Sequence, residues 1–316
     1  MGMRFVVWFE PERVHQGTWL DIHHPKWVLG VGKERLLNLG DEDARRWLTD
    51  HISEMIKQGG IDIYRNDFNM DPLEYWRGAD ASDRQGMTEI RYVEGLSEFW
   101  GELLRRDPNL MIDNCASGGR RIDLETMSRS VPLCRTDYSV GGAAAQAQGV
   151  GLGLYLPLSA TGPTATPSIP ADIPDLYTAR SAMSAGIVLN WDPRRPAFDE
   201  GLARRIVKEQ ERIAKFYYGN WYPLTSVTES EEAWFAYQYH RQDLGEGMIM
   251  AFRRGKATDK SITVKLRGLT AEATYELEDV DSQRKMIAAG KKLAEGLRLN
   301  ILSSPGSILL TYRVRK

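Results

Sequence analysis

Apolar residues in the first part of the chain follow two alternating patterns. Residues 4–9, 61–66 and 110–114 are short runs rich in β-branched and aromatic side chains, which is typical of buried strands. Residues 41–57 and 89–106 instead carry apolar side chains at helical spacing, which predicts amphipathic helices. Strands that alternate with helices are joined by crossovers, and crossovers produce a parallel sheet. The pattern therefore predicts an α/β fold.

The same alternation continues further along the chain. It predicts strands at residues 132–136, 155–159 and 186–190, and helices at residues 174–183 and 198–218. Residues 11–38 and the segment after residue 67 follow neither pattern, so we expect long loops there. Polar or aromatic residues come directly after several predicted strands: Glu10, Asp67, Cys115, Asp137, Trp191 and Asp192. In a (β/α)8 TIM barrel all of these positions face one mouth, so a barrel is favoured over an open sheet.

The pattern changes from about residue 221. Strand-like runs separated by turns rich in Gly, Asp and Lys occur at residues 234–239, 247–252, 261–266, 273–277 and 307–314. They predict a small antiparallel β domain. A chain of 316 residues is long enough for a second domain, because single cores stop growing at about 250 to 300 residues. We therefore expect a catalytic barrel domain at residues 1–220 and a C-terminal β-sandwich at residues 221–316.

The charge balance excludes several classes of partner. The 41 basic and 43 acidic residues are mixed along the chain and give a net charge of -2, so we expect neither nucleic acid nor a membrane as a partner. No run of about 20 apolar residues could cross a bilayer, and residues 1–12 lack the features of a signal peptide. The two cysteines, Cys115 and Cys134, are too few for a disulfide framework and indicate a reducing compartment. We therefore expect a cytoplasmic protein.

Two carboxylates at predicted strand ends, Asp67 and Asp137, are candidates for catalysis. A glycosidase needs such a pair, because one carboxylate attacks or activates water while the other protonates the leaving oxygen. Alternation along the strand places Arg65 on the same face as Asp67, where its charge would keep the carboxylate ionised. The ring of Trp8 could stack on a sugar, and Arg65 and Arg121 could bind sugar hydroxyls.

Each of these features also has a simpler explanation. A single Asp after a strand is often a turn residue or a helix cap, and Trp8 could be a core aromatic. Residues 115–121, CASGGRR, could cradle a phosphate, although they match neither the Walker pattern nor the dinucleotide fingerprint. His15, His23 and His24 share one loop, but they lack the helical spacing and the carboxylate partner of a metal site. We therefore expect no metal and no cofactor.

Four motifs occur in a characteristic order. Residues 8–12 read WFEPE, and residues 65–69, RNDFN, are similar to Lys-Trp-Asp-x-Asn. Residues 115–123, CASGGRRID, match Cys-x-x-Gly-Gly-x-Arg-x-Asp, and residues 136–138, TDY, are similar to Ser-Asp-Asn. Taken together, the motifs resemble those of the α-galactosidases of glycoside hydrolase family 36, the melibiases.

The resemblance implies a retaining glycoside hydrolase that cleaves terminal α-linked galactose by double displacement. Asp67 would be the nucleophile and Asp137 the general acid/base. The substrate would be an oligosaccharide or another galactoside, no metal would take part, and the chain would form a homo-oligomer. Contacts to the sugar would come from Trp8, Arg65, Asn69, Cys115, Gly118 and Arg121.

Three departures from the family pattern keep other functions open. Arg65 stands where the family has Lys, Asn66 where it has Trp, and Tyr138 where it has Asn, and all three changes affect the sugar pocket. A hydrolase of a related α-glycoside, such as an N-acetylgalactosaminide, is one alternative, and an α-galactosyl transglycosylase is another. A carbohydrate-binding pseudoenzyme is a further alternative, although the retained Asp67 and Asp137 argue against it. A phosphosugar isomerase or aldolase on the same barrel is a third, but the sequence lacks the phosphate loop expected late in the barrel.

The resemblance begins partway through the family's barrel. Relatives carry a large N-terminal β-sandwich and two further barrel strands, so the fold implied here is a partial TIM barrel with strands three to eight. Its open strand edges would be costly, because unpaired strand groups invite association. We therefore expect the chain to be a truncated reading of a longer gene that is inactive or poorly active alone.

Overall fold

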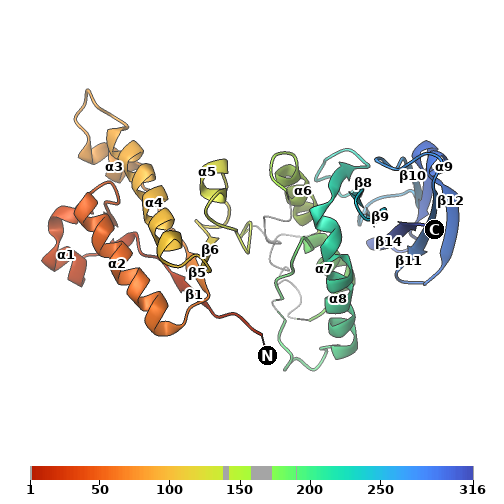
Figure 1. Cartoon of the computed structure of the whole chain (residues 1–316), viewed down its shortest axis with the longest axis horizontal. Helices are drawn as coiled ribbons and strands as arrows, with labels where there is room; N and C mark the ends of the chain where they lie inside the picture. The colour runs from red at the N-terminus through yellow and green to blue at the C-terminus, as the bar shows by residue number, and fades with distance from the viewer. Residues whose placement is uncertain (1, 138–141, 158–172, 190, 316) are drawn as a thin grey trace. The chain divides into compact units, whose positions relative to one another are not determined.

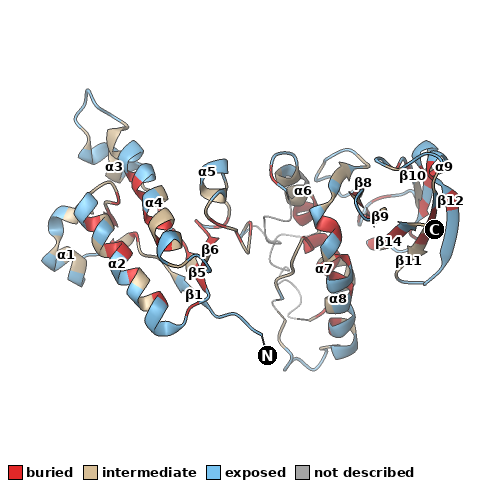
Figure 2. Ribbon diagram, viewed as in Figure 1, coloured by how far each residue is buried: buried red, intermediate tan, exposed pale blue. Residues whose placement is uncertain are grey.

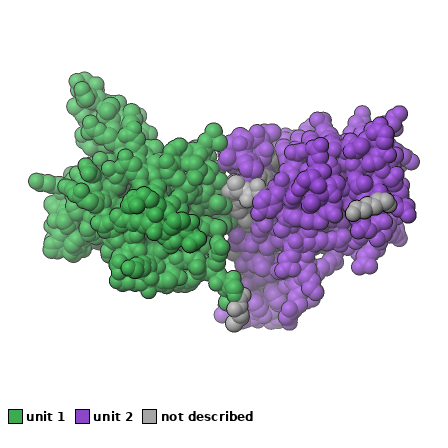
Figure 3. Space-filling view, viewed as in Figure 1, with its two compact units in different colours: residues 1–135 green, residues 136–316 purple. Residues whose placement is uncertain are grey.

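The computed structural model describes residues 2–137, 142–157, 173–189 and 191–315. The chain forms two compact units, Met1–Arg135 and Thr136–Lys316, and each is described by itself (Figures 1 and 3). No helix within the described residues is both long enough and apolar enough to cross a membrane.

The first unit contains a parallel sheet, a small antiparallel sheet and several helices. Its strands are β1 (Val6–Phe9), β2 (Arg13–His15), β3 (Val28–Leu29), β4 (Glu34–Leu37), β5 (Ile63–Asn66) and β6 (Met111–Asn114). Its helices are α1 (Trp19–His23), the 3-10 turn η1 (Pro25–Trp27), α2 (Glu42–Gly59), α3 (Leu73–Ala79), α4 (Met87–Arg106) and α5 (Leu124–Met127).

The parallel sheet has the strand order β1-β5-β6, and the crossovers between its strands contain α2 and α4. Helix α2 begins where the Asp41 side chain accepts a hydrogen bond from the Ala44 amide, and it ends at Gly60, whose φ of 59° suits glycine. The apolar faces of α2 and α4 are buried, as the red segments of Figure 2 show. They share one hydrophobic core with strand residues such as Tyr64 and Ile112, so the alternation predicted from the sequence is confirmed for these elements.

The segment at residues 11–38, expected to be a loop, contains a second sheet. Strands β2, β4 and β3 pair in that order and antiparallel, and α1 and η1 lie between β2 and β3. The pattern missed these strands because residues 11–38, rich in Trp, His and Pro, follow neither the helical nor the strand period. The loop expected after residue 67 likewise contains helix α3.

The predicted strand at residues 132–136 is wrong. One bridge, between Val131 and Asp113, is formed there, and the chain then leaves the sheet. At residues 155–157 no strand forms, and residues 158–159 lie outside the described part of the chain. The strand expected at residues 186–190 is limited to a bridge at Val188, and residue 190 is not described. An apolar run alone does not supply a partner strand, which accounts for these errors.

The second unit combines helices with a large antiparallel sheet. Its helices are α6 (Gly142–Gly153), α7 (Leu176–Ala182), α8 (Glu200–Ile213), the 3-10 helix η3 (Ala214–Tyr218) and α9 (Gly290–Glu295). Its strands are β7 (Asn220–Pro223), β8 (Trp234–Arg241), β9 (Glu246–Arg253), β10 (Ser261–Val264), β11 (Thr274–Asp279), β12 (Lys285–Ala289), β13 (Leu297–Asn300) and β14 (Gly306–Val314).

The six-stranded sheet, in the order β12-β11-β14-β9-β8-β7, is covered on both faces. Met248, Met250 and Phe252 of β9 share a core with residues of α7, α8 and η3. Ile249 and Ala251 of the same strand share another core with β10, β13 and α9. Because successive side chains point to opposite faces, a strand covered on both sides is a continuous apolar run, as the sequence is at residues 247–252.

The antiparallel β region predicted from about residue 221 therefore exists, although its first strand begins at Asn220. The two compact units divide between Arg135 and Thr136, so they do not coincide with the expected domains, 1–220 and 221–316. Helices α6, α7 and α8 belong with the sheet because α7, α8 and η3 cover one of its faces. The expected domain assignment stays a prediction.

Candidate active site

Asp67 comes directly after β5, the middle strand of the parallel sheet. In the strand register, Trp8 of β1 lies opposite Arg65, and Arg65 lies opposite Asp113 of β6. Since the strands are parallel, their carboxyl ends meet at one edge, and polar side chains from all three strands gather there. This arrangement is the one expected for a site at strand ends.

The Asp67 carboxylate is held by several hydrogen bonds. The indole nitrogen of Trp8 donates to Oδ2 at 2.9 Å. Backbone amides of Phe68 and Ser117 donate to Oδ1 at 2.7 and 3.3 Å. Asp67 is 7% exposed, so these donors largely replace water as its hydrogen-bond partners.

These hydrogen bonds also set the charge of Asp67. Burial by itself raises the pKa of a carboxyl group, but hydrogen bonds from Trp8, Asn69, Cys115 and the Phe68 amide outweigh burial and lower the pKa of Asp67 below its ordinary value. The carboxylate is therefore ionised at neutral pH, as a nucleophile must be.

Arg65 has a different partner from the one predicted. Its guanidinium pairs with Asp113 at 2.5 Å, and Asp113, 2% exposed, also accepts a hydrogen bond from the Leu133 amide at 2.8 Å. Burial lowers the pKa of Arg65, but the Asp113 carboxylate raises it by more. Because the charge of Arg65 is balanced by Asp113, the ionised state of Asp67 rests mainly on its hydrogen bonds.

The loop that follows β6 closes around Asp67. Burial raises the pKa of Cys115 to about 12, so this residue is a neutral thiol that can donate to the carboxylate. Ser117 and Gly118 have φ angles of 47° and 83°, and this pair in the left-handed region turns the chain back. The Ser117 hydroxyl then donates to Asn69 Oδ1 at 2.9 Å, while the backbone N–H of Asn69 donates to Glu10 Oε1 at 2.7 Å.

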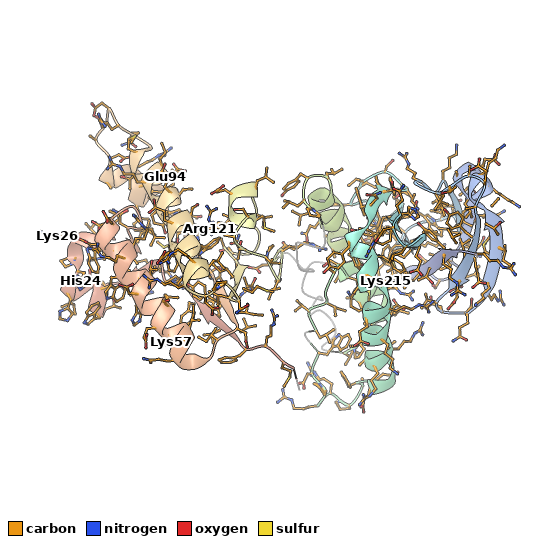
Figure 4. All side chains as sticks on the ribbon, viewed as in Figure 1. His24, Lys26, Lys57, Glu94, Arg121 and Lys215 are labelled. Atoms are coloured by element: carbon orange, nitrogen blue, oxygen red, sulfur yellow. The ribbon has the colours of Figure 1, made fainter. Side chains whose placement is uncertain are left out.

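Arg121 lies at the other end of this loop, near the middle of the first unit (Figure 4). Both of its terminal nitrogens pair with Glu12, at 2.8 and 2.6 Å, and the guanidinium lies 4.2 Å from the centre of the Phe68 ring. Burial lowers the pKa of Arg121, but Glu12 raises it well above its ordinary value. The contacts of Arg121 within the protein therefore favour a structural function over direct sugar binding.

Glu12, which is fully buried, is the centre of a hydrogen-bond network. Besides Arg121, it accepts hydrogen bonds from the Tyr92 hydroxyl and from the Asn66 amide, the latter at 3.1 Å. Asn66 in turn accepts from Tyr64 at 3.0 Å and from Trp100 at 3.2 Å. The network thus fixes the residue that precedes Asp67.

Asp137 belongs to the second unit, where it is an exposed residue outside any helix or strand. Tyr138, the next residue of the predicted TDY motif, lies outside the described residues. The placement of Asp137 opposite Asp67 therefore stays a prediction.

The structure brings most of the predicted site residues together in the first unit. Asp67 is surrounded by Trp8, Asn69, Cys115 and the loop at Gly118. Arg65 lies on β5, two residues before Asp67 and opposite Trp8 in the strand register. Sequence reasoning did not identify Asp113 as the partner of Arg65. The signal was its position inside a predicted strand, because a carboxylate buried there needs a charged or hydrogen-bonding partner. Among the described residues, no group of three His, Cys, Asp or Glu has the arrangement of a metal site.

The chain is similar in sequence to several proteins named alpha-galactosidases. The chain is 25% identical over 289 residues to alpha-galactosidase 1 of Pediococcus pentosaceus and 27% identical over 298 residues to alpha-galactosidase AgaA of Geobacillus stearothermophilus. These matches cover 87% and 88% of the chain but 39% and 40% of the relatives, so the chain spans about two fifths of their length.

The chain also resembles solved structures of α-galactosidases. The chain superimposes on the crystal structure of family GH36 alpha-galactosidase AgaA from Geobacillus stearothermophilus with a TM-score of 0.83 and 22% identity, covering 99% of this chain and 45% of that one. On the alpha-galactosidase of Lactobacillus brevis the TM-score is 0.82, with 21% identity and coverage of 100% and 45%.

The family assignment rests on a match to a family model rather than to single relatives. The model of the Melibiase family matches residues 1–167, more than half of the 316-residue chain. This range includes the four motifs described above, from WFEPE at residue 8 to TDY at residue 138. The chain belongs to the Melibiase family.

Proposed function

We propose that the chain is the catalytic part of a retaining glycoside hydrolase that removes terminal α-linked galactose. The observation that supports this most is the environment of Asp67, a buried carboxylate kept ionised by hydrogen bonds at the end of a parallel strand. Relatives named alpha-galactosidases support the reaction class. Crystal structures of AgaA variants in complex with raffinose and with stachyose support a galactoside as substrate.

In the proposed mechanism Asp67 attacks the anomeric carbon and forms a covalent glycosyl-enzyme, while Asp137 gives a proton to the departing oxygen. Asp137 then takes a proton from water, and this water releases the sugar from Asp67. The lowered pKa of Asp67 suits the first step, because only the carboxylate is nucleophilic.

The sugar would lie against Trp8, a residue that is 53% exposed although its indole nitrogen donates a hydrogen bond to Asp67. Arg65, Asn69, Cys115 and Gly118 would border the subsite and contact hydroxyl groups. For Arg121 we propose a positioning function, because both of its terminal nitrogens are occupied by Glu12.

We also propose that β1, β5 and β6 correspond to strands three to five of a TIM barrel. Support comes from their parallel order and from the superposition on GH36 enzymes. Among the described residues, β1 pairs only with β5, and Phe5, Val6 and Trp8 beside its other edge are exposed. Such an edge would be completed by further strands, or by a second copy if the enzyme is a homo-oligomer.

The test is the release of p-nitrophenol from its α-galactoside by this chain and by any longer product that its gene encodes. We expect activity in a protein that carries the whole barrel, and its Asp67→Asn variant should lose at least about a thousandfold. A galactose-configured cyclitol epoxide should form one adduct, on the peptide that contains Asp67. If the variant retains full activity, or if the adduct forms elsewhere, Asp67 is not the nucleophile.

A second assay separates the alternatives. With an excess of acceptor sugar, a transglycosylase produces longer oligosaccharides, whereas a hydrolase releases galactose. Cleavage of an N-acetylgalactosaminide but not of a galactoside would keep the mechanism and change the sugar. Sugar binding without cleavage of either substrate would leave a carbohydrate-binding pseudoenzyme.

A further inference from the structure

A second cluster of aromatic side chains lies on the outer side of the first unit. It is built by α1, η1 and α2 and contains Trp19, Trp27, Trp47, His23, His24 and His51. With the neighbouring His15, the cluster gathers four of the five histidines of the chain, so its composition is far from random. Figure 4 shows His24 well apart from Arg121, which belongs to the network beside Asp67.

The rings of this cluster are stacked on one another. Trp19 and Trp47 lie 5.4 Å apart with 22° between their planes, and Trp47 stacks on His51 at 5.1 Å and 9°. On the other side, His24 stacks on Trp27 at 3.8 Å and 8°. Stacking of this kind holds each ring in a fixed orientation, so a ligand would meet a preformed aromatic surface.

Part of the cluster lines a cavity of about 620 Å³, a volume within the range of small-molecule sites. The aromatic lining comes from Trp19 and Trp47, and the polar lining from Arg13, His15, Thr18 and His51. Trp19 is 50% exposed, which is unusual for an indole whose only function is to fill a core.

The polar groups of the cavity favour a neutral ligand that both donates and accepts hydrogen bonds. Arg13 is already paired with Glu10 at 2.5 Å and lies 3.8 Å from Glu34, so its charge is balanced and an anion gains little. A neutral imidazole has one donor and one acceptor nitrogen. The Thr18 hydroxyl donates to the His15 carbonyl at 2.7 Å, so its lone pairs remain to accept.

We infer that this cavity is a second carbohydrate-binding site, distinct from the site around Asp67. A pyranose combines an apolar face of C–H groups, which fits an indole, with hydroxyls around its edge, which fit imidazole, hydroxyl and guanidinium groups. A lipid chain would have no use for these polar groups, and a phosphate would need an unpaired cation. The site would hold a sugar unit of a longer substrate, or a free sugar, on the outer surface of the first unit.

The test uses the indole N–H signals of the ¹⁵N-labelled protein, with methyl α-D-galactopyranoside as the probe. We expect the signals of Trp19 and Trp47 to shift and to saturate, while that of Trp234 in the second unit stays in place. The Trp19→Ala variant should bind about tenfold more weakly, equivalent to about 1.4 kcal/mol. The Trp19→Phe variant keeps a stacking ring and should stay within about threefold of the parent.

Two controls make the outcome decisive. Trp8→Ala should leave the shifts of Trp19 and Trp47 unchanged, because Trp8 belongs to the site around Asp67. The flat dye 1-anilinonaphthalene-8-sulfonate tests for a merely apolar patch. The inference is overturned if the dye shifts these two signals and the sugar does not, or if the sugar shifts them only while Trp8 is present. Either result leaves the hydrolase proposal standing, since that proposal is tested at Asp67.

Discussion

In the first unit a buried carboxylate, Glu12, holds Arg121, Asn66 and Tyr92 together beneath Asp67. In the second unit a buried guanidinium, Arg180 of α7, joins Glu209 of α8 to Asp281, which lies between β11 and β12. Arg180 is fully buried and makes two hydrogen bonds to each carboxylate, at 2.6 to 2.9 Å.

The two networks have similar chemistry but different neighbours. Glu12 accepts a hydrogen bond from Asn66, the residue that precedes Asp67, so a change at Glu12 alters the site as well as the fold. Arg180 connects α7 and α8 to the six-stranded sheet, which has an apolar core on each face. None of the residues that we propose for the reaction lies in this network. A buried ion pair alone therefore does not mark a functional site, and its neighbours have to be considered.

The largest effect is expected for Glu12→Gln. The substitution leaves Arg121 buried with no charged partner, which should reduce the free energy of unfolding of the first unit by about 3 to 5 kcal/mol. Urea denaturation followed by tryptophan fluorescence measures this loss. The matched control is Glu125→Gln, which breaks an exposed pair with Arg129 and should cost less than about 0.5 kcal/mol. Equal effects of the two substitutions would contradict a structural function for Glu12.

Glu209→Gln should have a smaller effect. Arg180 keeps Asp281 as a partner after this change, so we expect a loss of about 2 kcal/mol, confined to the second unit. Hydrogen exchange of α8 and β9 amides, read by mass spectrometry, reports this loss. The turnover of galactoside should stay the same, in contrast to Glu12→Gln. Reduced turnover with unchanged exchange would show that the Arg180 network also serves the reaction.

Trp8→Phe tests the charge state of Asp67. The hydrogen bond from Trp8 is among those that hold the pKa of Asp67 below its ordinary value, so removing it raises this pKa. The acidic side of the pH profile of kcat/KM, which reports the ionisation of Asp67, should therefore move to higher pH. A pH profile of kcat/KM, measured on the active enzyme and on its Trp8→Phe variant, shows the shift. An unmoved acid limb would mean that the amides and Cys115 alone set the pKa.

The lowered pKa of Asp67 also determines how the free energy of unfolding should change with pH. A carboxyl group whose pKa is lower in the folded state stabilises the fold above its unfolded pKa, which is about 3.9 for Asp. This contribution is lost as the pH falls through the folded pKa. Asp67→Asn should therefore reduce the dependence of unfolding on pH below about pH 4.

The sequence predicted the long elements well because their signals are local. Helices α2 and α4 have caps or apolar faces that can be read along the chain, and β8 and β9 are long apolar runs. The strand expected at residues 132–136 failed because a strand needs a partner, and a single sequence does not name one. Strands β2, β3 and β4 were missed because residues 11–38, rich in Trp, His and Pro, follow neither the helical nor the strand period.

The sequence named residues that the structure brings together around Asp67, but it did not predict how they pair. Alternation placed Arg65 on the face of Asp67, yet Arg65 pairs with Asp113, which lies opposite it on β6. Cross-strand neighbours depend on the register between strands, which the period of two within one strand does not reveal. Arg121 is a similar case, because its partner Glu12 is 109 residues away in the sequence.

The smallest expected effects come from two matched helix caps, one in each unit. Asp41 caps α2 and Asp199 caps α8, and each side chain accepts a hydrogen bond from an amide of the first turn. Replacing either with Ala should cost about 1 kcal/mol. If the units are independently cooperative, Asp41→Ala should speed amide exchange in α2 and leave α8 unchanged, and Asp199→Ala should do the reverse. Faster exchange in both helices from either substitution would instead show that the two units unfold together, and that the Glu12 and Arg180 networks stabilise a single structure.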